Sequence, residues 1–164
     1  DDIFMGRIET VWSSAAALEE QVLDADVIIG AVLIPGAAAP KLITRSLVSQ
    51  LQNGTVMVDV AIDQGGCFET SRATSYQDPS YEVDGVVHYC VANMPGGVAR
   101  TATLALTNAT LPYVVRLANS GLDALRDDPR FALGLNVHDG KLTHAGVGEA
   151  FSLDVIAVQD ALKL

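Results

Sequence analysis

The chain has 164 residues, of which 20 are Asp or Glu and 10 are Lys or Arg, so its formal net charge at pH 7 is −10. Nucleic acids and anionic membrane surfaces are themselves negative, so neither is an expected partner. Hydrophobic residues make up 49% of the chain, enough to bury the core of a domain, but no stretch reaches the roughly 18 apolar residues that a membrane span needs.

Strands and helices are predicted to alternate over the first part of the chain, about thirty residues apart, which is typical of βαβ units and a parallel sheet. In chain order, the patterns predict a strand at 7–12, a helix at 13–26 capped by Ser13 or Ser14, a strand at 26–33, a helix that begins at Thr44 and ends at Asn53-Gly54, a strand at 55–60, an irregular stretch at 64–85 and a strand at 86–93. The strand at 26–33 is a continuous apolar run, as expected for a strand buried on both faces.

The pattern changes after residue 95. A long helical segment is expected from Val98 to Asn119-Ser120-Gly121, with Pro112 kinking or restarting it. One or two short helices and a hairpin turn at 138–144 follow. We therefore divide the chain into residues 1–95, a Rossmann-like, mostly parallel α/β sheet, and residues 96–164, a long helix and a return segment.

Three of the predicted strands end in a similar way. Residues 32–33, 60–63 and 91–94 each precede glycine or proline, at Pro35-Gly36, Gly65-Gly66 and Pro95-Gly96. In open α/β sheets, ligands bind outside the carboxyl ends of the strands, where glycines let a flat ligand approach the backbone. The three ends favour a nucleotide or dinucleotide site, although glycine and proline also follow many strands simply because the chain must turn.

Asp63 is the sharpest candidate for chemistry among these residues. Beside a bound nicotinamide, its carboxylate could take a proton or orient a base or hydroxyl, or it could simply close an Asx-turn. Asn93 has the same two readings, as a ligand for a carboxamide or as a turn residue. His88 lies within a strand, where a structural histidine is expected.

No metal site and no export signal are expected. Cys67 and Cys90 are too few to hold a metal ion, no His, Cys and Asp cluster has ligand spacing, and a reduced pair is typical of the cytoplasm. The chain opens with Asp1 and Asp2, unlike a signal peptide. Because it lacks both an initiating Met and the G-x-G-x-x-G loop of a first βα unit, we expect a piece of a longer protein in which that unit precedes it.

Several motifs together identify a family resemblance. The stretches ADVIIGAVLIPGAAAPKLITRSLV, VMVDVAIDQGGCFETSRAT and VVHYCVANMPGG closely resemble the carboxyl-terminal part of bacterial L-alanine dehydrogenases, over about residues 1–151. The resemblance implies an NAD-dependent oxidoreductase that interconverts L-alanine with pyruvate and ammonia, with two domains, the cofactor between them and usually a hexameric assembly. The nucleotide-binding subunit of proton-translocating transhydrogenase is similar to a smaller extent.

The resemblance also implies roles for individual residues. Asp63 matches the catalytic aspartate near the nicotinamide, and Ser13 matches a residue near the adenosine. The segments that line the NAD site in the family match Val32, Leu33, Val60, Ala61, Ile62, Asp63, Val91, Ala92, Asn93 and Met94.

Other family features are absent from this chain. The catalytic histidine, the lysine and arginine that hold the substrate carboxylate and the acidic residue that holds the ribose have no counterpart here. An acidic residue and a histidine with a proposed metal role in some members are replaced by Arg116 and Ser120. We therefore expect the intact protein to be an alanine dehydrogenase and these 164 residues to be inactive alone. The alternatives are a transhydrogenase subunit and a non-catalytic module that docks on a partner.

Overall fold

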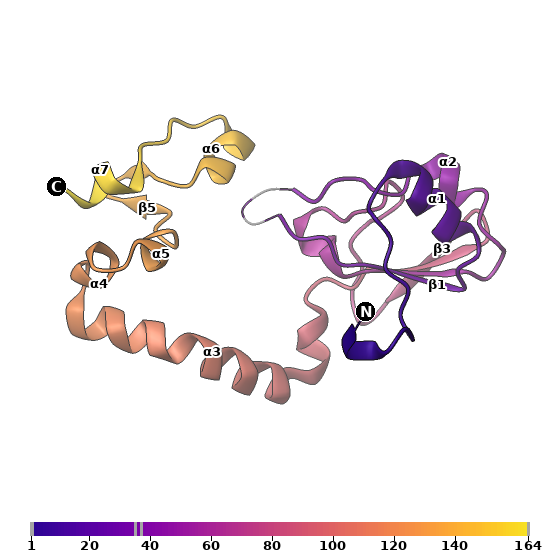
Figure 1. Ribbon diagram of the computed structural model, residues 1–164, viewed down its shortest axis with the longest axis horizontal. Coiled ribbons are helices and arrows are strands. Elements are labelled where there is room, and N and C mark those ends of the chain that lie inside the picture. Colours follow the sequence, from indigo (N-terminus) through magenta and orange to yellow (C-terminus); the bar gives the residue numbers. More distant parts are fainter. Residues whose placement is uncertain (1, 35, 37, 164) are drawn as a thin grey trace. The chain divides into compact units, whose positions relative to one another are not determined.

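The computed structural model describes residues 2–34, 36 and 38–163, so Pro35, in the predicted break after a strand, lies outside the described residues. The chain divides into two compact units (Figure 1). Unit 1 comprises Asp1–Leu33 and Ala39–Ala92, and unit 2 comprises Ile34–Ala38 and Asn93–Leu164. Unit 1 thus ends at Ala92, whereas the sequence suggested a boundary between residues 95 and 96.

Unit 1 is built on a four-stranded sheet with the order β1-β2-β4-β3. Strands β1 (Val27–Gly30), β2 (Val56–Asp59) and β4 (Val86–Tyr89) are parallel, and β3 (Ser80–Val83) pairs antiparallel with β4. Gly30 lies opposite Asp59, and Val58 lies opposite Tyr89, so the three parallel strands end at the same edge. The predicted mostly parallel α/β sheet is confirmed.

Two helices of unit 1 begin at the predicted caps. Helix α1 (Ala15–Leu23) follows Ser14, whose hydroxyl accepts a hydrogen bond from the Ala17 N–H, and α2 (Arg45–Val48) follows Thr44, which accepts from Leu47. These elements cover one face of the sheet. The buried cluster between them contains Val22, Ile28, Ala39, Ile43, Leu47, Val48, Leu51, Met57, Ala61, Cys67, Phe68 and Val86.

The opposite face of the sheet is only partly covered by the described residues, and it is most exposed along β1. In β1 the side chains alternate, with Ile28 only 9% exposed while Val27 and Ile29 are 55% and 66% exposed. The expectation that the strand at 26–33 is buried on both faces was therefore wrong for this chain. A continuous apolar run predicts that other elements pack against both faces of the strand, and the described residues pack against only one of them.

Two further differences concern strands. Residues 7–12 form no strand, because no described segment pairs with them, and Glu9 to Trp12 are exposed. Conversely, β3 lies inside the stretch expected to be irregular. Its hairpin with β4 turns at Asp84-Gly85, both with positive φ, and such a pair is a strong hairpin signal.

Unit 2 begins with a short 3-10 helix, η3 (Met94–Val98), and the long helix α3 (Ala99–Ser120). Pro112 lies within α3, which is one continuous helix from end to end, so the predicted restart was wrong.

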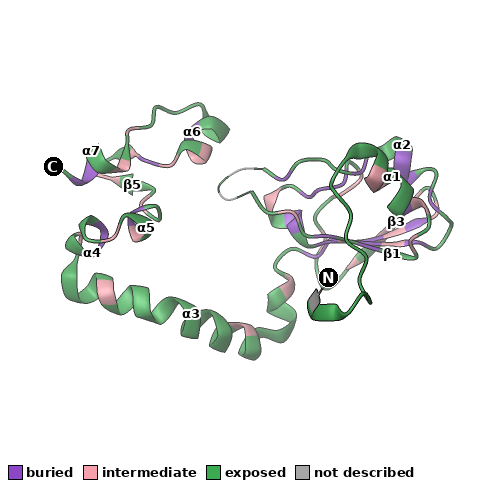
Figure 2. Cartoon of the chain, in the orientation of Figure 1, coloured by how far each residue is buried: buried purple, intermediate pink, exposed green. Residues whose placement is uncertain are grey.

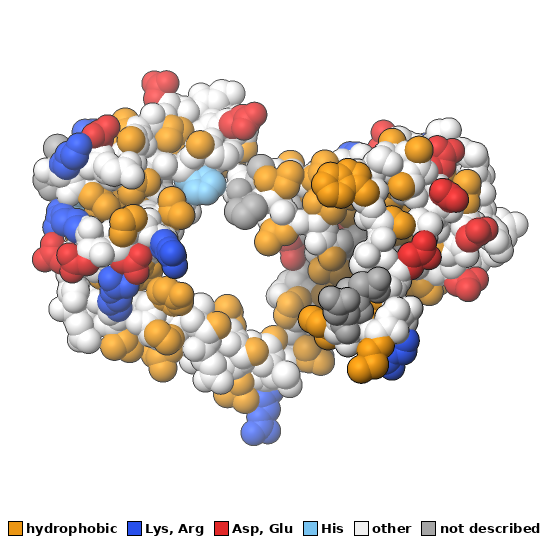
Figure 3. All heavy atoms as spheres, in the orientation of Figure 1, with side chains coloured by type: hydrophobic (Ala, Val, Ile, Leu, Met, Phe, Trp, Pro, Cys, Tyr) orange, Lys and Arg blue, Asp and Glu red, His pale blue; other side chains and the backbone are white. Residues whose placement is uncertain are grey.

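Figure 2 shows α3 exposed along most of its length, and Figure 3 shows hydrophobic side chains on its surface. No residue from Thr101 to Val115 is charged. No helix among the described residues is long and apolar enough to cross a membrane.

The rest of unit 2 consists of short elements: α4 (Asp123–Arg126), α5 (Pro129–Ala132), β5 (Val137–His138), β6 (Lys141–Leu142), α6 (Ala145–Phe151) and α7 (Val158–Leu162). The predicted hairpin is confirmed as the antiparallel pair β5 and β6. Arg116 of α3 donates to the Asp128 carboxylate at 2.7 Å, which lowers the pKa of Asp128. A small core forms around Leu125, Ala132 and Leu162.

The exposed part of this sheet face leads to a test on the 164-residue chain. We expect Ile29→Lys to change the free energy of unfolding by less than about 1 kcal/mol and to reduce binding of a hydrophobic dye, since Ile29 faces solvent. The matched Ile28→Lys, one residue away, places an unpaired ammonium in the core and should cost roughly 3 kcal/mol or more. Urea unfolding and dye fluorescence measure both effects, and equal costs for the two variants would contradict the assignment of the faces.

Candidate functional site

A cavity of about 350 Å³ lies at the carboxyl ends of β1 and β2. Its lining is mostly apolar, and all of it belongs to unit 1. The lining residues are Ala31, Val32, Leu33, Val60, Ala61, Asp63 and Gln64. The parallel strand order therefore brings two of the three predicted strand ends to one hollow, with a carboxylate among apolar side chains.

Asp63 lies in a short 3-10 helix, η2 (Val60–Gln64), which starts directly after β2. Ala61 and Ile62 are buried and anchor η2 to the core, whereas Asp63 is exposed at the wall of the cavity. A carboxylate in this position can meet a bound molecule without leaving water. Ala31 and Gln64 also line the cavity, although the sequence analysis did not select them. The only indication in the sequence was that each is next to a predicted site residue, Val32 or Asp63.

The third predicted strand end, residues 91–94, is not part of the lining of this cavity. Val91 is fully buried and forms an isolated bridge with Thr74, so its side chain belongs to the core of unit 1. Ala92 is exposed in the following turn, and Asn93 and Met94 belong to unit 2.

Asn93 has a φ of 55°, in the left-handed region that Asn tolerates better than most residues. Ser13 is exposed in the extended segment before α1. A role for these residues in cofactor binding stays a prediction.

A buried carboxylate holds the chain that follows η2. Asp59, at the end of β2, is fully buried and accepts hydrogen bonds from the Cys67 N–H at 2.9 Å, the Cys67 thiol at 3.6 Å and the Ser71 hydroxyl. Gly66 has φ +75°, and a Cβ there would lie 2.6 Å from the Asp59 carboxylate. Gly66 is therefore needed to let the chain fold back over Asp59, and Gly65 is favoured by its left-handed φ of 88°.

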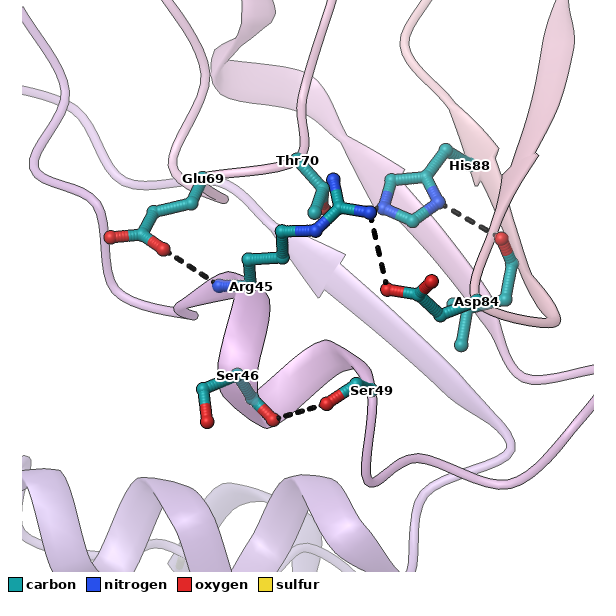
Figure 4. Close-up of polar contacts among 8 residues, drawn as sticks. Arg45, Ser46, Ser49, Glu69, Thr70, Asp84 and His88 are labelled. Atoms are coloured by element: carbon teal, nitrogen blue, oxygen red, sulfur yellow. Dashed lines mark hydrogen bonds and ion pairs between the residues drawn. The ribbon is translucent and has the colours of Figure 1, made fainter.

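The next residues are fixed by a second group of polar contacts. The Glu69 carboxylate accepts from the Arg45 N–H at 2.7 Å at the start of α2, and the Arg45 side chain lies 3.5 Å from Asp84 (Figure 4). Thr70 contacts Nε2 of His88 at 2.7 Å, and the Nδ1 of His88 contacts the Val86 carbonyl at 3.0 Å. A carbonyl only accepts, so Nδ1 carries the proton and Nε2 accepts from the Thr70 hydroxyl.

Burial shifts the titration of three groups around this segment. It raises the pKa of the Cys67 thiol to about 11, with the Asp59 charge adding to the effect. It also raises the pKa of the Tyr81 hydroxyl, which donates to the Thr70 carbonyl at 2.8 Å. It lowers the pKa of His88, which is fully buried and stacks on Tyr81 with the ring centroids 5.0 Å apart. All three groups are thus kept neutral at pH 7, as structural groups are.

No group of three or more His, Cys, Asp or Glu side chains that could hold a metal ion occurs within residues 2–34, 36 and 38–163.

Comparison with known proteins finds a consistent set of relatives. The sequence model of the family described as "Alanine dehydrogenase/PNT, C-terminal domain" matches residues 1–145. The alanine dehydrogenase of Halomonas elongata is 66% identical over 157 residues, which are 95% of this chain and 42% of that protein. The alanine dehydrogenase of Staphylococcus haemolyticus is 52% identical over 165 residues, 99% of this chain and 44% of that protein.

Solved structures agree with these relatives. An L-alanine dehydrogenase structure matches with a TM-score of 0.77 and 54% identity, over 92% of this chain and 42% of that one. A transhydrogenase from Sinorhizobium meliloti matches with a TM-score of 0.61 and 26% identity, over 81% of this chain and 36% of that one. The chain thus spans less than half the length of each of these proteins.

The neutral, buried His88 makes stability depend on pH. Its pKa is lowered in the folded state, so as the pH falls below about 6.5 the unfolded chain binds a proton that the folded chain does not. We expect the free energy of unfolding to decrease from pH 7.5 to 5.5, and the decrease to be smaller in His88→Gln. Urea unfolding at both pH values measures this difference. An equal pH dependence in the two proteins would show that His88 is not the group responsible.

Proposed function

The chain belongs to the alanine dehydrogenase/PNT C-terminal domain family, and we propose that the full-length protein is an NAD-dependent alanine dehydrogenase. It would interconvert L-alanine with pyruvate and ammonia. The single observation that carries the proposal is the 66% identity to the Halomonas elongata alanine dehydrogenase over 95% of this chain.

The same comparisons weigh against the transhydrogenase alternative. The Sinorhizobium meliloti transhydrogenase structure shares the fold, but its identity is 26%, against 54% for the L-alanine dehydrogenase structure. The unbroken sequence Asp63-Gln64-Gly65-Gly66-Cys67 supports the dehydrogenase as well, because the resemblance implies that the transhydrogenase subunit usually lacks this run.

The cavity at the strand ends suits the nicotinamide end of NAD. Its walls offer apolar side chains of Val32, Leu33 and Val60 to a flat ring, and the backbone of the turns after β1 and β2 offers polar groups to a carboxamide. We assign these residues to ring contact and Asp63 to the reacting side of the site. When bound, NAD supplies the acceptor for a hydride.

Asp63 would handle protons in the reaction. In the oxidative direction a hydride leaves Cα of alanine and a proton leaves its nitrogen, which gives an imine. Water then adds at the imine carbon, ammonia leaves, and pyruvate remains. The Asp63 carboxylate would orient the attacking water and accept its proton, since the side chain is exposed at the cavity wall.

The rest of the active site would come from the part of the protein outside this chain. We assign the substrate-carboxylate contacts, the catalytic histidine and the pyrophosphate loop to that part, since the chain spans 42–45% of its curated relatives. The exposed sheet face would be covered by that part of the protein. We further propose a cytoplasmic protein that assembles as a hexamer.

A direct test is NAD reduction by L-alanine in the full-length protein, followed at 340 nm with pyruvate as product. We expect alanine-dependent reduction in the full-length protein and none in the 164-residue chain alone. Hydride transfer between two nicotinamide nucleotides without alanine turnover would favour the transhydrogenase instead.

Replacement of Asp63 tests its role in the full-length protein. Asp63→Asn keeps the shape of the side chain but removes the base, so kcat should fall by roughly a hundredfold or more. Asp154→Asn, at another exposed aspartate, is the matched control and should retain wild-type turnover. Steady-state kinetics at saturating NAD and alanine measure both, and an Asp63→Asn enzyme with near wild-type kcat would discard the catalytic role.

A further inference from the structure

The segment 39–43 is bonded to four successive carbonyl groups of the chain after Asp63. The Ala39 N–H donates to the Gln64 carbonyl at 3.0 Å, and the Leu42 N–H donates to the Cys67 carbonyl at 2.7 Å. Between them, the ammonium of Lys41 donates to the carbonyls of Gly65 at 2.6 Å and Gly66 at 2.8 Å. Main-chain N–H groups thus bond the first and last of these four carbonyls, and the Lys41 side chain bonds the two between them.

We propose that Lys41 is a positioning residue for Asp63, acting through the Gly65-Gly66 pair; this inference rests on the proposed function. Both glycines have left-handed φ values, 88° and 75°. Their two carbonyl oxygens converge on one ammonium, and without that charge their partial negative charges would repel each other. Lys41 therefore stabilises the conformation of the pair.

The glycine pair in turn closes the turn that carries Asp63. The Gly65 N–H donates to the Ile62 carbonyl and the Gly66 N–H donates to the Ala61 carbonyl, each at 3.0 Å. A change in the orientation of either glycine peptide plane breaks one of these bonds. The end of η2 would then loosen, and the Asp63 carboxylate would move relative to the cavity.

Lys41 is also poorly placed to serve the core. The residue is exposed, and the buried cluster of unit 1 contains no part of it. The fold of the Gly65–Ser71 segment is held separately by the buried Asp59 carboxylate. Removal of the ammonium should therefore leave the protein folded and alter mainly the precision of the turn.

The test uses three variants of the full-length protein. Lys41→Met keeps the length of the side chain without its charge, Lys41→Arg keeps donors for both carbonyls, and Lys163→Met removes an exposed lysine elsewhere. We expect Lys41→Met to lower kcat roughly ten- to a hundredfold, because small misplacements of a reacting group are costly, with KM values within about threefold of wild type. Lys41→Arg should recover most of the loss, and Lys163→Met should match wild type.

A Lys41→Met protein with kcat within about twofold of wild type would overturn the inference. So would a loss that Lys41→Arg does not relieve, or one that disappears when rates are corrected for the unfolded fraction measured by thermal unfolding.

Hydrogen exchange supplies a readout that does not need turnover. In Lys41→Met, the amides of Gly65 and Gly66 should exchange at least about tenfold faster than in wild type, while those of β2 stay unchanged. If the wild-type protein did not oxidise alanine, the proposed function would be wrong. The hydrogen-exchange comparison would still show whether Lys41 holds this turn. Unchanged exchange at both glycines would refute the inference directly.

Discussion

The hydrogen bonds that hold residues 64–67 from two sides decide where Asp63 lies. On one side the buried Asp59 carboxylate takes the Cys67 N–H, and on the other the segment 39–43 donates to four successive carbonyls. A loop of this kind would otherwise be free to vary, because it contains two glycines with no side chains to pack. Its conformation is therefore set by polar contacts, and the wall of the cavity is set with it.

Much of this arrangement follows from the sequence. The apolar runs at β1, β2 and β4 and the helix between the first two predict a parallel sheet, and parallel strands deliver their ends to one edge. That reasoning placed Val32, Leu33, Val60, Ala61 and Asp63 together, and the cavity is lined by all five. The caps Ser14 and Thr44 were also predictable, because a hydroxyl before a helix has one dominant local role.

Other features depend on contacts distant in the sequence. The alternation of exposure in β1 depends on whether a second layer covers the sheet, and an apolar run is compatible with either outcome. Val91 was grouped with the cofactor-lining residues by position, and the structure shows its side chain fully buried, which depends on packing that the local sequence does not reveal; its role in cofactor binding stays a prediction. Strand β3 was missed because polar residues precede it, although Asp84-Gly85 signals its hairpin. Lys41 contacts the carbonyls of Gly65 and Gly66, which follow it in the sequence by 24 and 25 positions, and no local pattern in the sequence predicts these contacts.

The buried thiol at Cys67 has a chemical consequence of its own. Burial, with the Asp59 charge adding to it, raises the pKa of this thiol to about 11, so the thiol form dominates at pH 7, and the thiolate is the form that attacks alkylating agents and peroxide. The sulfur acts instead as a weak donor to Asp59. Cys67, four residues after Asp63, is thus buried and mostly protonated, so oxidants and alkylating agents should modify it only slowly while the fold is intact.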